Sequence, residues 1–198
     1  VPVAAAVSAS TNEDTAKTFN LIGTDVEGAN NGGSHVVTYS IVSNPSNGSL
    51  SSIDAPTVNG ASITYTPNSN WNGTDTFTYK VNDDTVDSNT ATVTVTVAAV
   101  NDAPVTTAIA TTINENRTAR MVGITLQGTD VDGNSLTYSV VSDASNGSTS
   151  ISGATLTYNA NQDWNGTETI TYKANDGTVD SNTSTITITV NAVNDVPV

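Results

Sequence analysis

The feature that most constrains the fold is a strict alternation of threonine with apolar residues. Residues 92–97 are Thr-Val-Thr-Val-Thr-Val, and residues 185–190 are Thr-Ile-Thr-Ile-Thr-Val. Because successive side chains of a β-strand point to opposite faces, a period of two predicts strands with one buried and one solvated face. Residues 76–81 and 169–174 alternate in the same way, and no segment has convincing helical spacing. We therefore expect an all-β chain.

An internal repeat sets the number of domains. Residues 63–105 and 156–198 align without a gap, with 29 of 43 positions identical, and both end in Asn-Asp-x-Pro-Val. This repeat predicts two tandem domains, which we place at residues 1–102 and 103–198. Turn dipeptides such as Asn-Gly divide each copy into short segments. Roughly seven strands in a unit of this size predict an antiparallel Greek-key β-sandwich.

The charge balance excludes several classes of function. With 19 acidic and 5 basic residues, the formal net charge is -14, which repels nucleic acid and anionic membranes and favours cations as partners. No apolar run approaches the roughly 18 residues that a membrane-spanning helix needs, so we expect no membrane insertion. The chain has no cysteine, which excludes disulfides and thiolate metal sites.

The acidic residues recur at matched positions in the two copies. Seven pairs hold 14 of the 19 acids, and a repeated cation site would explain the match, although a recent duplication would also preserve acids without a function. The pairs are Glu13 with Glu115, Asp25 with Asp130, Glu27 with Asp132, Asp75 with Glu168, Asp83 with Asp176, Asp87 with Asp180, and Asp102 with Asp195.

Three acidic segments can meet at one end of a sandwich. Asp130-Val131-Asp132-Gly133 lies in a loop between expected strands, Asn101-Asp102 precedes Pro104 in the linker, and Asp176 ends a strand at a tight turn. Loops two strands apart in an antiparallel sandwich share an end of the domain. Carboxylates gathered in one place repel each other unless a cation neutralises them, and oxygen ligands without His or Cys favour calcium over magnesium.

These residues resemble the cadherin fold and its bacterial cadherin-like tandem repeats, which are found in large surface adhesins. Asn101-Asp102-Ala103-Pro104 is similar to the linker motif Asp-x-Asn-Asp-Asn-x-Pro, and Asp130-x-Asp132 to the Asp-x-Asp motif. Glu13 and Glu115 resemble the glutamate at the base of the domain. The linker departs from the motif because alanines replace an expected aspartate, at residue 98 or 99, and the last asparagine, at residue 103.

The resemblance implies a calcium-binding, non-catalytic repeat pair of a secreted or surface-anchored bacterial adhesin, rigidified by Ca²⁺ at the linker. The implied partners are neighbouring repeats of the same chain and a cell-surface glycan or protein, and the chain is expected to be a monomer. The implied ligands form one cluster: Glu13, Asn101, Asp102, Asp130, Asp132 and Asp176. Half-sites are implied by Asp25, Glu27 and Asp83 at the start and by Glu115, Asn194 and Asp195 at the finish.

Other interpretations remain open at this point. Trp71 and Trp164 could offer a stacking surface in a glycan- or protein-binding module of an extracellular multidomain protein, but we expect them to cap the core. A calcium-independent immunoglobulin-like spacer is a third hypothesis. Asp75 and Glu168 are expected to be exposed strand residues rather than ligands. With one His and no Cys, the sequence offers little for acid–base or nucleophilic catalysis, so we do not expect an enzyme.

Overall fold

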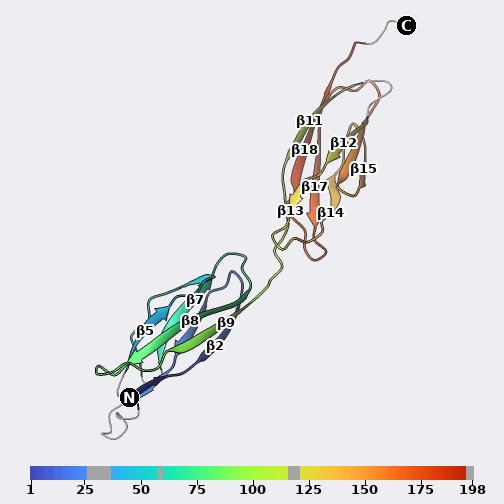
Figure 1. Ribbon diagram of the computed structural model, residues 1–198. Coiled ribbons are helices and arrows are strands. Elements are labelled where there is room, and N and C mark those ends of the chain that lie inside the picture. The colour runs from blue at the N-terminus through green and yellow to red at the C-terminus, as the bar shows by residue number, and fades with distance from the viewer. Residues whose placement is uncertain (26–36, 58–59, 116–120, 195–198) are drawn as a thin grey trace. The chain divides into compact units, whose positions relative to one another are not determined.

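The computed structural model describes residues 1–25, 37–57, 60–115 and 121–194. The chain divides into two compact units, Val1–Val100 and Asn101–Val198, each shown as a ribbon in Figure 1. The described residues form strands, turns and loops. No helix long and apolar enough to cross a membrane is found among them.

Each unit contains nine strands within its described residues. Those of the first unit are β1 (Pro2–Ala4), β2 (Val7–Asn12), β3 (Lys17–Leu21), β4 (Gly23–Asp25), β5 (Thr38–Ser43), β6 (Gly48–Leu50), β7 (Ala61–Pro67), β8 (Gly73–Asn82) and β9 (Ala91–Ala98). Those of the second unit are β10 (Val105–Thr106), β11 (Ile109–Asn114), β12 (Met121–Thr125), β13 (Gly128–Thr129), β14 (Thr137–Ser142), β15 (Gly147–Ser152), β16 (Thr155–Ala160), β17 (Gly166–Asn175) and β18 (Ser184–Asn191).

Both units have the same sheet topology. The first has a four-stranded sheet, β2-β9-β8-β5, a three-stranded sheet, β3-β7-β6, and a separate pair, β1-β4. The second repeats this order as β11-β18-β17-β14, β12-β16-β15 and β10-β13. The two tandem β-sandwiches predicted from the sequence are confirmed. One pair in each unit departs from antiparallel pairing, because the first long strand runs parallel to the last, as β2 with β9 and β11 with β18.

The core of each unit is built by the alternation seen in the sequence. In β9, Val93 and Val95 are fully buried while Thr92 and Thr96 are exposed. Tyrosines are the largest fully buried side chains: Tyr79 and its counterpart Tyr172 have no exposed surface. Because aromatic side chains bury large apolar areas, they let sandwiches of this small size hold a dry core.

The tryptophans lie at the edge of these cores, as predicted. Trp71 and Trp164 are partly buried and pack against the first and second core, respectively. The glycine two residues later adopts a φ of +139° at Gly73 and +144° at Gly166, and a Cβ atom there would lie 3.1 Å from the indole ring. A glycine at this position therefore lets the ring lie flat on the turn and close the end of the core.

The prediction that Asp75 and Glu168 are exposed strand residues is wrong. Asp75 is 4% exposed and Glu168 is 3% exposed. Asp75 accepts hydrogen bonds from the backbone N–H groups of Ser46 and Asn47, at 3.1 and 2.8 Å, and from the Tyr65 hydroxyl at 3.1 Å. Both acids occupy the inward phase of their strands, so the alternation itself places them inside. Asp75 thereby binds the turn before β6 to the core, and Glu168 binds the turn before β15.

Candidate functional site

The Asp130 loop follows strand β13 in the second unit and is closed by its own hydrogen bonds. Asp130 Oδ1 accepts the backbone N–H of Asn134 at 3.1 Å, and the N–H of Gly133 points to Asp130 O at 3.4 Å. Gly133 has a φ of +75°, a left-handed conformation that glycine adopts without strain. The tight turn fixes Asp130 and Asp132 within the same short loop.

The Asp176 turn follows strand β17. Asp176 Oδ1 accepts the backbone N–H groups of Thr178 and Val179, at 2.6 and 2.7 Å. Its second oxygen, Oδ2, accepts Asn101 Nδ2 at 2.7 Å. The Asn101 amide and, next in importance, the Val179 N–H hold the pKa of Asp176 below its ordinary value of 3.8. This carboxylate is therefore ionised at neutral pH.

The segment Asn101-Asp102 joins the two loops. Asn101 donates to Asp176 and accepts Asn134 Nδ2 through Oδ1 at 3.1 Å. The backbone N–H of Asp102 donates to Asp132 Oδ2 at 2.8 Å. Five of the six residues that the resemblance implies as ligands, all except Glu13, thus belong to one hydrogen-bonded neighbourhood of the second unit.

One carboxylate oxygen in this neighbourhood has no donor. Asp130 Oδ2 is buried from solvent and makes no hydrogen bond within the described residues. A buried polar atom without a partner costs free energy, typically about 1–3 kcal/mol and more when it is charged. A cation beside Asp130 Oδ2 would supply the missing interaction, and the surrounding oxygens belong to the hard donor class that calcium prefers.

The described residues contain no group of three or more His, Cys, Asp or Glu side chains that could hold a metal ion. The neighbourhood described above mixes carboxylates with asparagine amides and backbone groups. Its carboxylates are spread over two loops and the linker segment rather than converging on one point.

The glutamate at the base of each unit has a different partner. Glu13 is 4% exposed and accepts the backbone N–H of Val100 through Oε1 at 2.5 Å, within the first unit. Glu115 repeats this contact with the N–H of Val193 at 3.0 Å and also accepts Asn165 Nδ2 at 3.1 Å. Each glutamate binds the chain shortly after the last strand of its unit. That Glu13 shares an ion with Asn101 and the others stays a prediction.

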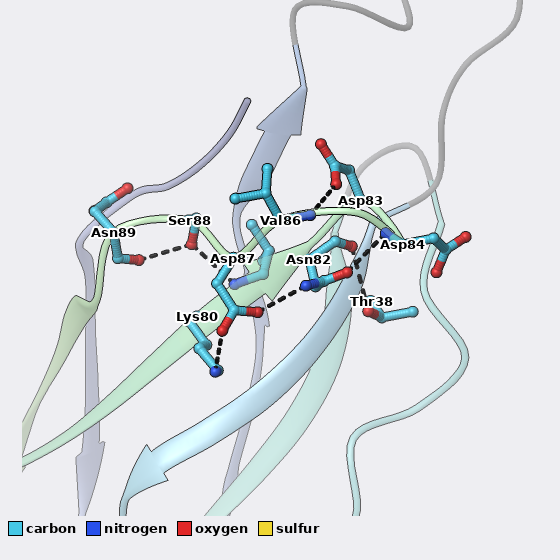
Figure 2. A network of polar contacts seen from close by, with 10 residues as sticks. Thr38, Lys80, Asn82, Asp83, Asp84, Val86, Asp87, Ser88 and Asn89 are labelled. Atoms are coloured by element: carbon cyan, nitrogen blue, oxygen red, sulfur yellow. Dashed lines mark hydrogen bonds and ion pairs between the residues drawn. The ribbon is translucent and has the colours of Figure 1, made fainter.

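The predicted half-site at the start is described in part. Figure 2 shows Asp83 in the turn after β8, where its Oδ1 accepts the N–H of Val86 at 2.8 Å. The same oxygen accepts the N–H of Thr85 at 2.9 Å. The Val86 N–H contributes most to lowering the Asp83 pKa. Asp25 ends β4 and lies 3.4 Å from the amino group of Val1.

The remaining half-site residues are described unevenly. Glu27 and Asp195 lie outside the described residues. Asn194 follows β18, and its role as a ligand stays a prediction.

A second polar network in the same turn was not singled out from the sequence. Figure 2 shows Asp87 between Lys80, with which it forms an ion pair, and the Asn82 amide, which donates at 2.7 Å. Lys173, Asn175 and Asp180 repeat this arrangement in the second unit. The lysine is the main cause of the lowered pKa of Asp87 and of Asp180. The sequence could have indicated this network, because the same Lys, Asn and Asp occur at matched positions in both copies.

The comparison with protein families matches each unit separately. Residues 1–96 match the family described as the bacterial Ig domain, and residues 101–192 match the bacterial cadherin-like domain. The comparison with curated proteins gives no match.

Solved structures with the same fold include human cadherins. Human protocadherin-24 EC1-2 is 16% identical with a TM-score of 0.61, over 94% of this chain and 95% of that one. Human CDH23 EC21-23 is 17% identical with a TM-score of 0.56, over 95% and 67% of the two chains. At these identities the likeness concerns the fold alone.

An endo-fucoidan hydrolase of glycoside hydrolase family 107 is also similar to this chain. It is 20% identical with a TM-score of 0.39, over 97% of this chain, which spans only 29% of the length of that protein. Together, these matches confirm the resemblance seen in the sequence: the chain is made of two tandem β-sandwich domains, the first matching the bacterial Ig domain and the second the bacterial cadherin-like domain.

Proposed function

We propose that the second unit binds a calcium ion beside Asp130, and that the two domains serve as a non-catalytic stalk or spacer in a secreted or surface-anchored bacterial adhesin. The observation that carries the calcium proposal is the buried, unpartnered oxygen Asp130 Oδ2. The proposed ligands are those of the second unit that the hydrogen bonds bring together: Asn101, Asp102, Asp130, Asp132 and Asp176.

The electrostatics of this neighbourhood favour a cation. The hydrogen bonds to Asp130, Asp132 and Asp176 described above come from neutral N–H groups, which leave the negative charge of each carboxylate in place. Negative charges in one neighbourhood repel each other, and more strongly the closer they lie. A divalent cation would turn this repulsion into attraction.

The kind of ligand supports calcium rather than magnesium. Calcium accepts 6–8 oxygen ligands in flexible geometry, whereas magnesium requires a near-ideal octahedron. Carboxylates from two loops, an asparagine amide and backbone carbonyls offer such a variable set. Asp132 and Asn134 are exposed, so water can complete the coordination.

Calorimetric titration of the chelator-treated chain with calcium chloride tests the proposal. We expect binding in the unsubstituted chain and at least a tenfold loss of affinity in the variant Asp130→Asn. The matched control is Asp143→Asn: Asp143 follows β14 and is exposed, at the opposite end of that strand from Thr137, the residue that pairs with Asn175. The calcium proposal fails if millimolar calcium gives no binding heat, or if both variants bind like the unsubstituted chain.

The predicted role of Glu13 is examined with a separate variant. Glu13→Gln keeps the side-chain carbonyl that can accept the Val100 N–H but removes the charge. If Glu13 is a ligand, this variant should bind calcium more weakly than the unsubstituted chain. Equal affinity would limit the site to the residues of the second unit.

The stalk role is supported by the family matches, since bacterial Ig-like and cadherin-like domains are tandem modules of extracellular proteins. In this role the ion would limit the movement of the loops around Asp130 and Asp176. Solution scattering with and without calcium measures the consequence, and we expect longer and more uniform particles when calcium is present. Identical scattering profiles would argue against stiffening even if calcium binds.

A further inference from the structure

In each sandwich, the first long strand pairs in parallel with the last strand. In the first unit, β2 pairs with β9 over six residues, from Val7 opposite Val93 to Asn12 opposite Ala98. In the second unit, β11 pairs with β18 over six residues in the same way. Figure 1 shows β2 and β9 side by side along the length of the first unit.

Parallel pairing determines how such a unit meets tension. Because the strands run in the same direction, the start of β2 and the end of β9 lie at opposite ends of the pair. A pull on the two ends of the unit slides one strand along the other and loads all the ladder hydrogen bonds together. A pull across the strands would instead break those bonds one after another, which requires less force.

Between β1 and β2 the chain changes sheets, and Ala4 and Ala5 form this crossing. The side-chain amide of Asn89 is hydrogen-bonded to the first of these two residues. Ala4, the last residue of β1, donates its N–H to Asn89 Oδ1 at 3.1 Å, and its carbonyl accepts Asn89 Nδ2 at 3.0 Å. Ala4 itself is 3% exposed. The side chain of Asn89 therefore replaces a missing strand at this residue and ties β1 to the segment that leads into β9.

A buried tyrosine secures the next residue of the crossing. The Tyr79 hydroxyl oxygen lies 2.6 Å from the carbonyl oxygen of Ala5 and accepts the N–H of Ile22 at 3.0 Å. The N–H of Ala5 donates to the carbonyl of Ile22 at 3.0 Å. With the Asn89 bonds, the N–H and carbonyl groups of both crossing residues are hydrogen-bonded.

The second unit repeats the same device with different residues at the crossing. Thr106 donates its N–H to Asn182 Oδ1 at 2.9 Å and accepts Asn182 Nδ2 at 3.1 Å. The Tyr172 hydroxyl lies 2.6 Å from the carbonyl oxygen of Thr107. The crossing residues differ between the units, Ala4-Ala5 and Thr106-Thr107, while Asn and Tyr are the same.

We propose that each unit bears tension along the chain through its parallel strand pair, and that Asn89 and Asn182 are positioning residues that keep the entering strand aligned for shear. Without the asparagine side chain, a pull on the chain separates the crossing residues from the sheet first. The force then acts on one end of the parallel strand pair, and its hydrogen bonds break one after another. The device requires no ion, so it is independent of the calcium proposal.

Single-molecule stretching of the complete chain, held by its ends at constant force and in the presence of a chelator, tests this proposal. Two unfolding events are expected, one for each unit. Asn89→Ala should speed one event by about tenfold, as expected when roughly two ordinary hydrogen bonds are lost, and Asn182→Ala should speed the other. The matched controls are Thr38→Ala and Thr137→Ala, which each remove one side-chain hydrogen bond from the edge strand β5 or β14.

A second measurement keeps the test decisive even if a variant folds poorly. The chain has no cysteine, so handles can be attached to the paired substitutions Ser8→Cys and Thr38→Cys, on the two edge strands of the sheet β2-β9-β8-β5. The first unit should unfold faster across this sheet than along the chain at the same force, and Asn89→Ala should then have little effect. Equal rates in both directions, or asparagine variants no faster than the threonine controls, would overturn the proposal.

Discussion

Two acids of the second unit, Glu168 and Asp130, show how the same chemical group can serve opposite purposes. Glu168 is 3% exposed, and both of its oxygens accept backbone N–H groups, from Asn146 at 2.6 Å and Thr169 at 3.2 Å. Asp130 has one satisfied oxygen and one buried oxygen without a partner. A carboxylate whose oxygens are all satisfied stabilises the fold, whereas an open buried oxygen is available to a ligand.

The largest expected effect comes from removing the charge of a fully satisfied acid. Asp75→Asn and Glu168→Gln each place an NH₂ group against backbone donors that need an acceptor, so each should lower the free energy of unfolding by about 3 kcal/mol. Denaturant titration in the presence of a chelator measures this loss. Asp143→Asn, at an exposed position, should change it by less than about 0.5 kcal/mol. Equal losses of unfolding free energy in the buried and exposed variants would show that the buried acids do not stabilise the fold more than an exposed acid does.

The next effect concerns the open oxygen. Asp130→Asn should leave the stability of the calcium-free protein nearly unchanged, because Asp130 Oδ2 has no donor to lose. It should at least halve the stabilisation by calcium, which in the unsubstituted chain reaches about 2.7 kcal/mol at a free calcium concentration of 100 times the Kd. Thermal melts with calcium and with chelator measure both quantities. A large loss of stability without calcium would show that Asp130 acts like Glu168.

An alkaline titration sharpens the description of the Glu168 region. Burial, and secondarily the charge of Glu168, raise the pKa of Tyr158 from 10.0 to about 12. The folded state therefore keeps a proton that the unfolded state loses, so this contribution to stability is complete below pH 10 and disappears as the pH rises towards 12. Tyrosinate absorbance follows the titration. In Glu168→Gln the pKa of Tyr158 should be lower. An unchanged pKa would show that the charge of Glu168 does not act on Tyr158.

The smallest effect is expected at the surface of the candidate site. The pKa of Asp176 is lowered from 3.8 by Asn101 and by the N–H groups of its turn. Its contribution to stability is therefore present above pH 3.8 and is lost as the pH falls through the lower pKa of the folded state. In calcium-free buffer, Asp176→Asn should flatten this acidic part of the stability curve. An identical curve for the variant would show that the turn does not depend on the charge.

The sequence predicted the fold well because the repeating pattern is local. The Thr-Val alternation of residues 92–97 and its counterpart at 185–190 both appear as the central strands β9 and β18 of four-stranded sheets. The parallel pairing of β2 with β9 was not predicted, since alternation gives the face of a residue but not the direction of its neighbour.

Five of the predicted ligands lie in one hydrogen-bonded neighbourhood, and that they bind an ion stays a prediction. The matched acids pointed to Asp130, Asp132 and Asp176, and the structure connects these loops through Asn101 and Asp102. Asp75 was misjudged because its acidic character outweighed its inward phase next to Phe77. Asn89 was overlooked because an asparagine between two strands resembles an ordinary turn residue.

The hydrogen bonds from Val100 to Glu13 and from Val193 to Glu115 also bear on how such genes can grow. In each unit, the N–H of the second residue beyond the last strand donates to a glutamate encoded in the same unit. A DNA segment duplicated from one junction to the next would therefore carry both the glutamate and its backbone donor. Recombination in whole units is thus the least damaging way to change the number of such units, and insertions of fractional units should be selected against.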